Sequence, residues 1–339
     1  MGLFSFFTQE LAIDLGTANT LIIHNDKIVV DEPSIVALDH RTGKVMAIGE
    51  KARQMHGKTH SNIITVRPLR DGVIADFNAA EIMIRGMIKK TKSSGIFAQS
   101  LKMVICIPSG STNVEIRAVR DSAEHAGGRD VYLIYEPMAA ALGIGLDVEL
   151  PEGHMVIDIG GGTSEIAVIS LGGIVCNESV NVAGDVFTED IQTYMKQQHN
   201  IKIGERTAEE IKIAVGSAVT NLEDAPEDFT VIGHSIIDSR PHVVPVSYQE
   251  IAYALDRSLA KVDAAILKVL EKTPPELYND IVRNGIYIAG GGALIKGIAE
   301  RFTEKTKIKC IVSEDPLRAV ARGTGIALKN CDRFSFLMR

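Results

Sequence analysis

The sequence lacks the signals of several common classes of protein. No stretch of the 339-residue chain reaches the about 18–20 consecutive apolar residues that span a bilayer. The first residues, MGLFSFF, have neither the basic region nor the long apolar region of a signal peptide, and Phe6 stands where the myristoylation pattern requires Ser or Thr. The cysteines are scattered without C-x-x-C spacing, as expected in a reducing compartment: Cys106, Cys176, Cys310 and Cys331. These absences predict a cytoplasmic protein that is neither secreted nor membrane-spanning.

Several motifs for nucleotides, metals and nucleic acids are also missing. No G-x-x-x-x-G-K-[ST] occurs, which excludes the P-loop mechanism, and no G-x-G-x-x-G follows a strand, which disfavours a dinucleotide fold. No H-E-x-x-H occurs, and the i,i+4 pair of His56 and His60 is better explained as two surface histidines than as a metal site. The net charge of −7 and pI near 5.8 argue against the broad basic surface that nucleic acid requires. We therefore expect no nucleic-acid partner.

The chain is long enough for two hydrophobic cores. Its 339 residues exceed the usual size of a single core, and 45% hydrophobic with 23% charged residues is typical of a globular protein. Apolar spacing predicts a helix over residues 77–92, and apolar runs predict strands over residues 103–108 and 131–137, each followed by a helix. Alternating strands and helices predict a parallel or mixed α/β sheet.

Two similar segments lie about one domain length apart. Residues 10–23 read ELAIDLGTANTLII and residues 154–169 read HMVIDIGGGTSEIAVI. In both, an apolar run meets an aspartate, Asp14 or Asp158, then a turn of small residues and a second apolar run. The spacing of 144 residues is far longer than the roughly 20–50 residues of solenoid repeats. The repeat therefore predicts two domains of similar architecture.

Turns of this composition suit a polyphosphate and its cation. Small residues let backbone N–H groups approach an anion, so two facing turns would hold a polyphosphate from both sides. Asp14 and Asp158 would then hold the waters of a Mg²⁺ ion. A third turn, Gly290 to Gly292, follows a strand and begins a helix. It suits contact with the nucleoside part of the same nucleotide. Each turn alone also fits an ordinary hairpin, so the prediction depends on finding all three in one chain.

Six motifs give the chain a resemblance to a known superfamily: DLGTANT, IPSGSTNVEIRAV, YEPMAAALG, DIGGGTSE, IAGGGAL and ARGTG. They look like the phosphate-1, connect-1, phosphate-2, adenosine and connect-2 motifs of the actin, Hsp70 and sugar-kinase superfamily. Over nearly the whole chain the sequence more closely resembles the MreB family of bacterial actins, which determine rod shape. The resemblance implies an α/β fold with two RNase-H-like domains of the actin-like ATPase type flanking a cleft for ATP or ADP with Mg²⁺. It also implies slow ATP hydrolysis coupled to assembly into filaments.

The resemblance further implies where the domains divide. Domain I would contain residues 1–144 and 317–339, with an inserted subdomain at about 32–76, and domain II would contain residues 145–316, with an insert at about 182–246. No low-complexity linker separates the halves, so we expect a hinge made of crossing helices instead of a flexible tether.

Individual residues receive roles from the same resemblance. The first phosphate loop corresponds to Gly16, Thr17, Ala18 and Asn19, and the second to Gly160, Gly161 and Gly162. The adenosine wall corresponds to Glu209, Glu210, Lys212, Gly290, Gly291 and Gly292. The catalytic set corresponds to Glu136, which would orient the attacking water, Thr163 as its helper, and the metal-holding Asp14 and Asp158. A solvated acid at a strand end is the ordinary alternative for Glu136.

A lysine-rich loop is a candidate membrane contact. Residues 89–102, KKTKSSGIFAQSLK, place Ile96 and Phe97 among small polar residues and four lysines. Two such side chains suit insertion into a bilayer, but they suit packing onto their own domain equally well. The resemblance implies membrane binding through this loop, through an N-terminal segment such as MGLFSFF, or both. Burial contributes about 1.5–3 kcal/mol per side chain and each lysine about 1 kcal/mol, so the anchor is weak in a monomer and gains strength in a polymer.

Three functions stay open on the sequence alone. The leading one is a cytoplasmic, ATP-dependent cytoskeletal polymer at the inner face of the cell membrane. Its partners would be further copies of itself in head-to-tail, paired filaments, the membrane surface, and membrane proteins of the wall-elongation machinery. The second is an Hsp70-like chaperone, although that family carries a large region after the ATPase and this chain stops soon after ARGTGIALKN. The third is a small-molecule kinase, which would require an acceptor pocket with a catalytic base.

Overall fold

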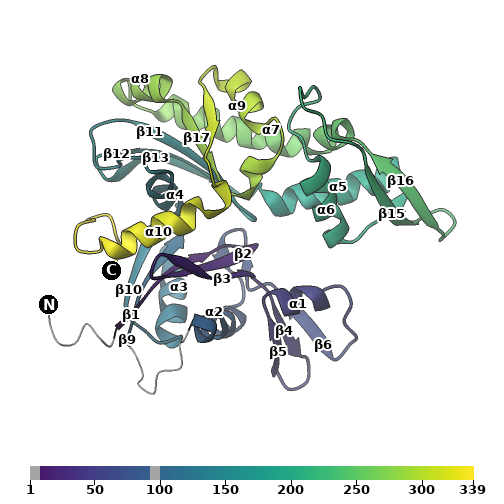
Figure 1. Cartoon of the computed structure of the whole chain (residues 1–339), viewed down its shortest axis with the longest axis horizontal. Helices are drawn as coiled ribbons and strands as arrows, with labels where there is room; N and C mark the ends of the chain where they lie inside the picture. The colour runs from purple at the N-terminus through teal and green to yellow at the C-terminus, as the bar shows by residue number, and fades with distance from the viewer. Residues whose placement is uncertain (1–7, 92–99) are drawn as a thin grey trace.

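The computed structural model describes residues 8–91 and 100–339, and it contains two five-stranded sheets built on one plan (Figure 1). The strand order of the first sheet is β10 (Gly128–Tyr135), β9 (Ser100–Ile107), β1 (Thr8–Leu15), β2 (Asn19–His24) and β3 (Lys27–Pro33). That of the second is β13 (Gly173–Val180), β12 (Ser164–Ser170), β11 (His154–Ile159), β17 (Ile286–Ala289) and β18 (Cys310–Val312). Each central strand pairs antiparallel on one side and parallel on the other.

Helices cover both faces of the first sheet. On one face, α2 (Phe77–Thr91) and α3 (Asn113–His125) share a core with Leu11 and Ile13 of β1. On the other face, Ala12 packs with α4 (Glu136–Ile144) and α10 (Ala319–Lys329). Successive residues of a strand point to opposite faces, so a strand covered on both sides is apolar at successive positions. This explains why the strand-like run before Asp14 is continuous instead of alternating.

The second sheet lies on the far side of α4 and α10 (Figure 1). Val156 and Ala167 share the core of these two helices, while Met155 and Ile157 face the opposite way. That opposite face is covered by α5 (Gly184–Gln198), α7 (Tyr248–Lys272), α8 (Pro275–Asn284) and α9 (Ile298–Thr306). The two sheets therefore enclose the crossing helices α4 and α10 between them.

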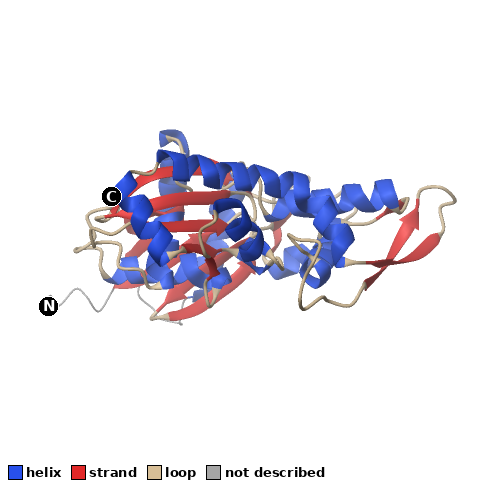
Figure 2. Cartoon of the chain, turned by 90° about the horizontal axis from the view of Figure 1, so that it is seen from above, coloured by secondary structure: helices blue, strands red, loops and turns tan. Residues whose placement is uncertain are grey.

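Two small sheets accompany the large ones. One consists of β4 (Val36–Asp39), β5 (Val45–Ile48) and β6 (Ile63–Val66), beside α1 (Glu50–Met55). The other consists of β14 (Ile201–Lys202), β15 (Phe229–Ser235) and β16 (Pro241–Val246), beside α6 (Glu205–Val215). Both lie at the end of the molecule away from the C-terminus, and Figure 2 shows β15 and β16 projecting from it. The exact domain boundaries given by the resemblance stay predictions.

Short elements complete the chain. They are the hairpin of β7 (Leu69–Arg70) and β8 (Val73–Ile74) and the 3₁₀ turns η2 (Gly291–Leu294) and η3 (Pro316–Arg318). Within the described ranges, no helix has the length and apolar character needed to cross a membrane.

Local features set two of the helix starts. Helix α7 begins at Tyr248 because Ser247 and Glu250 form a capping box. Glu136, expected at the end of a strand, is instead the first residue of α4. Pro137 follows it in the first helical turn, where the N–H group that proline lacks is not needed.

Candidate functional site

The two aspartate-led hairpins have the same strand register. Asp14 of β1 lies opposite Leu21 of β2, and Asp158 of β11 lies opposite Glu165 of β12. Both members of the second pair are 144 positions after those of the first. The repeat in the sequence is therefore a repeat of structure, with a small-residue turn after the same position of each central strand.

The two turns meet between the sheets. A Cβ atom added to Gly161 would lie 2.7 Å from the Cβ of Ala18, and one added to Gly162 would lie 2.8 Å from Oγ1 of Thr17. These distances are shorter than real carbon contacts, so the second turn approaches the first so closely that only glycine fits. The turns thus converge on one place, as two jaws of an anion site must.

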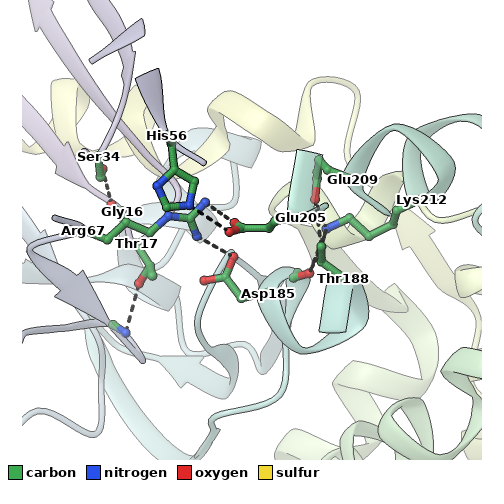
Figure 3. Close-up of polar contacts among 12 residues, drawn as sticks. Gly16, Thr17, Ser34, His56, Arg67, Asp185, Thr188, Glu205, Glu209 and Lys212 are labelled. Atoms are coloured by element: carbon green, nitrogen blue, oxygen red, sulfur yellow. Dashed lines mark hydrogen bonds and ion pairs between the residues drawn. The ribbon is translucent and has the colours of Figure 1, made fainter. Parts of the chain in front are cut away.

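Hydrogen bonds to carbonyl oxygens fix both turns. In the first, the hydroxyl of Ser34 donates to the carbonyl of Gly16 at 2.6 Å, and its backbone N–H donates to the carbonyl of Ala18 at 2.9 Å (Figure 3). In the second, the N–H of Gly184 donates to the carbonyl of Gly160 at 3.1 Å. These bonds hold the turns without occupying N–H groups, which are the groups an anion needs.

Three carboxylates are crowded behind the turns. Burial raises the pKa of Asp14 to about 6, although a hydrogen bond of 3.2 Å from the thiol of Cys106 opposes the shift. Burial, followed by the charges of Asp14 and Glu165, raises the pKa of Asp158 to about 8. Burial and the neighbouring acids raise the pKa of Glu136 well above its usual range. Water still reaches Asp14 and Glu136, but protein surrounds them closely enough to disfavour their charged forms.

A nearby cation would favour the charged forms of these acids, above all that of Asp158, whose pKa is raised to about 8. Asp158 is 5% exposed, and its Oδ1 atom accepts no hydrogen bond from the described residues. Over residues 8–91 and 100–339, no group of three or more His, Cys, Asp or Glu side chains is placed to ligate a metal directly. Two carboxylates, one with an oxygen that accepts no hydrogen bond from the described residues, fit a Mg²⁺ ion that Asp14 and Asp158 would hold through its water shell.

Lys212 and Glu209 form a polar cluster beside the second turn. The ammonium of Lys212 donates to the carbonyl of Gly184 at 2.8 Å and to the hydroxyl of Thr188 at 3.0 Å, and it lies 2.7 Å from Glu209 (Figure 3). Because the N–H of Gly184 also donates to Gly160 of the second turn, the cluster of Lys212 and Glu209 lies directly beside that turn. Glu210 is not part of it, because its carboxylate pairs at 3.1 Å with Arg206 on the exposed side of α6.

The third glycine turn lies against the second hairpin. Gly290 has a φ of 80°, and a Cβ atom there would lie 2.5 Å from Oδ1 of Asp158. A Cβ atom on Gly292 would lie 2.2 Å from the Cγ2 atom of Ile159. Gly291 has more room, with its nearest neighbour 3.4 Å away. Gly290 and Gly292 are thus needed for close packing onto β11, a reason that the sequence pattern did not reveal.

An ion-pair network beside the turns was missed by sequence reasoning. The guanidinium of Arg67 pairs with Glu205, the first residue of α6, and lies 3.6 Å from the carboxylate of Asp185 (Figure 3). Glu205 also lies 3.3 Å from the ring of His56, which bonds to Thr65 at 2.7 Å. These pairs join the two small-sheet regions. No local pattern predicts them, because the partners are far apart in the chain.

The remaining expected site residues lie in two places. Thr163 is buried directly before β12, and Asn19 begins β2 at an exposed position. Ile96, Phe97 and the segment MGLFSFF lie outside the described residues, so their membrane roles stay predictions.

Comparison with known proteins agrees with this geometry. A family model for MreB/Mbl protein matches residues 8–335. The chain is 45% identical over 328 residues to the cell shape-determining protein Mbl of Bacillus subtilis (strain 168), covering 96% of this chain and 98% of that protein. It is 45% identical over 331 residues to the cell shape-determining protein MreB of Escherichia coli (strain K12), covering 96% and 95%.

Solved structures share the fold. The crystal structure of MreB 5 of Spiroplasma citri bound to AMPPNP matches with a TM-score of 0.91 and 38% identity, covering 96% of this chain and 97% of that one. The MamK double helical filament matches with a TM-score of 0.79 at 20% identity, over 96% and 99% of the chains, which shows likeness of fold alone. The expected actin-like α/β fold with two domains is confirmed. Because the family model spans nearly the whole chain and the relatives match along nearly their full length, this chain belongs to the MreB/Mbl family.

Proposed function

We propose that this protein is an ATP-dependent, actin-like filament-forming protein that determines rod cell shape by organising cell-wall elongation. The observation that carries the proposal is the convergence of the two aspartate-led turns, where Gly161 and Gly162 approach Ala18 and Thr17. The names of the relatives support the cellular role, since both are cell shape-determining proteins. The Spiroplasma citri protein was crystallised with AMPPNP and with ADP, which supports a nucleotide at the same place.

The turns would hold the phosphates. Backbone N–H groups of residues 16–19, 161 and 162 would be offered by segments that small side chains leave open, while the N–H of Gly160 donates to the carbonyl of Thr163 at 2.9 Å. The two turns come from opposite halves of the molecule, so a triphosphate between them would bind both halves together. Asp14 and Asp158 would hold the waters of Mg²⁺, and this ion, when bound, supplies positive charge that offsets the charge of the phosphates.

Glu136 and Thr163 would position the water that attacks the terminal phosphate. Glu136 opens α4 in the first half, and Thr163 precedes β12 in the second half. A carboxylate and a hydroxyl on opposite sides can hold one water between them by two hydrogen bonds. Such positioning, with little covalent chemistry by the protein, is how phosphoryl transfer is catalysed.

The cluster of Lys212 and Glu209 would border the nucleoside. Lys212 is mostly buried, and its bonds to Gly184 and Thr188 fix it beside the phosphate turn. Gly290, Gly291 and Gly292 would complete the wall on the side of β17. Glu210 would take part only if α6 turned its outer face inward, because it now pairs with Arg206.

Nucleotide would act as a switch of assembly. ATP would fix the angle between the halves that the filament accepts, and hydrolysis would release it. Subunit contacts would be head-to-tail, since only such contacts propagate a filament, and filaments would pair. We place the polymer in the cytoplasm at the inner face of the cell membrane, anchored by Ile96 and Phe97 or by MGLFSFF and joined to membrane proteins of wall elongation.

The direct test is the substitution Glu136→Ala. If Glu136 orients the attacking water, this variant binds ATP as tightly as the wild type but releases phosphate more slowly. A fluorescent nucleotide titration measures the binding, and a coupled phosphate assay measures the release. Phosphate release at the wild-type rate would reject the assigned role.

The two alternative functions make different predictions. A filament pellets with ATP and liposomes and needs no acceptor, whereas a small-molecule kinase releases ADP only when its acceptor is added. A chaperone would bind unfolded polypeptide in the presence of ADP. Electron microscopy of the full chain on lipid with ATP should show filaments, and their absence together with acceptor-dependent ADP release would reject the polymer.

A further inference from the structure

Glu165 is a buried carboxylate for which the site described above gives no role. It lies in β12, in the apolar run SEIAVIS, and its side chain is 0% exposed. Its oxygens accept hydrogen bonds from one backbone amide and two hydroxyls. Within residues 8–91 and 100–339, no ion pair includes it. Burying a charged carboxylate costs free energy unless hydrogen bonds or an ion pair compensate for the lost water.

The fold itself does not require a carboxylate at this position. The first hairpin has the same register, and there the position opposite the aspartate is occupied by Leu21, which is 6% exposed and part of the core. An apolar residue therefore satisfies the hairpin. The carboxylate of Glu165 must therefore serve contacts with residues outside β11 and β12.

The bonds of Glu165 cross from one half of the molecule to the other. Its Oε2 atom accepts from the backbone N–H of Ser109 at 3.0 Å and also from the Ser109 hydroxyl. Ser109 follows β9 of the first sheet. The Oε1 atom accepts from the hydroxyl of Ser179 at 2.5 Å, and Asn177 donates to the Ser109 hydroxyl at 2.9 Å, both from β13 of the second sheet. Glu165 thus holds the end of β9 against the second sheet.

The end of β9 lies next to the expected catalytic groups. Ile107, the last residue of β9, pairs with Tyr135, the residue before Glu136. On the other side, a Cβ atom added to Gly72 would lie 2.7 Å from the Cγ atom of Pro108 and 3.1 Å from the Cγ2 atom of Thr163. Pro108 and Thr163 therefore border the same point, and Thr163 is two positions before Glu165 in the chain.

We propose that Glu165 is a positioning residue for hydrolysis: by hydrogen bonding to Ser109 it fixes the end of β9, and through it Glu136, relative to the turn that carries Thr163. The proposal deepens the proposed function and rests on it. Glu136 and Thr163 come from different halves. The hydrogen bonds between Glu165 and Ser109 fix the two halves relative to each other, so both catalytic side chains stay directed at one water. Displacement of catalytic groups by about 1 Å can cost about 100-fold in rate.

The test compares two substitutions at the same site. Glu165→Ala removes both hydrogen bonds that Glu165 accepts from Ser109, so kcat for phosphate release should fall by about 10-fold to 100-fold. The KM for ATP should stay within about threefold, because the phosphate turns are unchanged. Glu165→Gln keeps an oxygen that accepts from Ser109, and the Ser179 hydroxyl can rotate to accept from the new amide. It should therefore restore kcat to within about threefold of the wild type.

Two substitutions of the serines that donate to Glu165 compare a bond between the halves with a bond inside the second sheet. Ser109→Ala removes a hydroxyl whose bond crosses between the halves, whereas Ser179→Ala removes a hydroxyl whose bond to the same carboxylate stays within the second sheet. We expect Ser109→Ala to lower kcat at least about threefold more than Ser179→Ala does. Nucleotide-binding stoichiometry corrects each rate for the fraction of folded protein.

Each outcome decides one of the two proposals. If the wild-type protein binds no ATP or releases no phosphate, the proposed function fails. If the wild type hydrolyses ATP and Glu165→Ala does so at the same rate, the positioning role fails while the proposed function stands. Glu165→Gln as slow as Glu165→Ala, or equal losses from the two serine substitutions, would also overturn the role. If Glu165→Ala does not fold, Glu165→Gln and the serine pair still decide it.

Discussion

Arg67 and Glu205 form an ion pair that joins the segment after β6 to the first turn of α6. The pair therefore connects the region of one small sheet to the region of the other. The carboxylate of Asp185 lies 3.6 Å from the same guanidinium. The backbone N–H of Asp185 donates to the carbonyl of Gly161 in the second turn. The closure of the two halves and the position of that turn are thus linked through Arg67.

Arg67→Ala should accelerate nucleotide release. Loss of the pair removes an attraction between the halves, and partly exposed pairs contribute up to about 1 kcal/mol, so release should be about two- to fivefold faster. Raising the salt concentration should speed release from the wild type toward the rate of the variant, because salt screens such pairs. Stopped-flow displacement of a fluorescent ADP analogue measures the rate.

Arg206→Ala is the matched control for this prediction. Arg206 pairs with Glu210 on the same helix, on its exposed face, without touching the other half. Release from this variant should match the wild type at every salt concentration. Equal acceleration by both substitutions would show that charge loss on α6 and its surroundings, not the link between the halves, sets the rate.

Gly161→Ala should weaken ATP binding by about tenfold or more. The new methyl group would lie 2.7 Å from the Cβ of Ala18, so the two turns must move apart. Overpacking of this kind costs about 1–3 kcal/mol, and 1.4 kcal/mol is tenfold in affinity. Isothermal titration with a non-hydrolysable ATP analogue measures the loss. Gly204→Ala, where the new methyl group meets no atom within 4 Å, should bind normally.

Asp158→Asn should stabilise the nucleotide-free protein, and more at pH 8 than at pH 5. Burial raises the pKa of Asp158 from 3.8 to about 8, so between these values the folded protein holds a proton that the unfolded chain has released. A native state that binds more protons loses stability as pH rises. The wild type should therefore lose stability over this range, and the amide, which does not titrate, should remove the part of that loss that comes from Asp158. Thermal unfolding at both pH values measures it.

The same variant should lose its response to Mg²⁺ and ATP. In the wild type, a cation near Asp158 favours the charged carboxylate and offsets the loss of stability at high pH. We expect the unfolding temperature of the wild type to rise with Mg²⁺ and ATP by more than that of Asp158→Asn. Equal stabilisation of both proteins would show that Asp158 does not face the cation.

The sequence predicted those parts of the candidate site whose residues are consecutive in the chain. Asp14 and Asp158 could be found because a strand, an acid and a small-residue turn are consecutive in the chain. The motif assigned a role to Glu136 that stays a prediction, and it did not predict that Glu136 begins a helix. A periodic apolar run predicts a strand or helix well, but its ends depend on caps such as Ser247 with Glu250.

The parts that the sequence did not predict are made by contacts between distant residues. Arg67 and Glu205 are 138 positions apart, and nothing near either one indicates the other. Glu165 lies within a quoted motif, yet its task depends on Ser109 in the other half. A charged residue inside an otherwise apolar strand was the one signal that could have drawn attention to it. Adjacent acids such as Glu209 and Glu210 differ in role because helical spacing turns them to different faces.

Gly323→Ala should destabilise the protein by about 1–3 kcal/mol or more. A Cβ atom at Gly323 would lie 1.7 Å from the carbonyl oxygen of Ala139, so α4 and α10 could not keep their contact. Gly325→Ala on the same helix is the control, because its methyl group would lie 3.6 Å from the nearest atom and alanine favours a helix. Urea unfolding of both variants measures the difference. Equal stability of the two would contradict the close crossing.

The crossing of α4 and α10 is nearly symmetric. A Cβ atom at Gly143 would lie 1.8 Å from the carbonyl oxygen of Ala319, which mirrors the contact of Gly323 with Ala139. At these two glycines, the two helices that lie between the halves pack backbone against backbone. The small sheets lie away from this crossing (Figure 1), so a rotation of one half about it would be amplified at the small sheets. A turn of a few degrees at the glycines becomes a wide swing at those tips, and a polymer of such subunits would express the loss of one phosphate as a change in its own curvature.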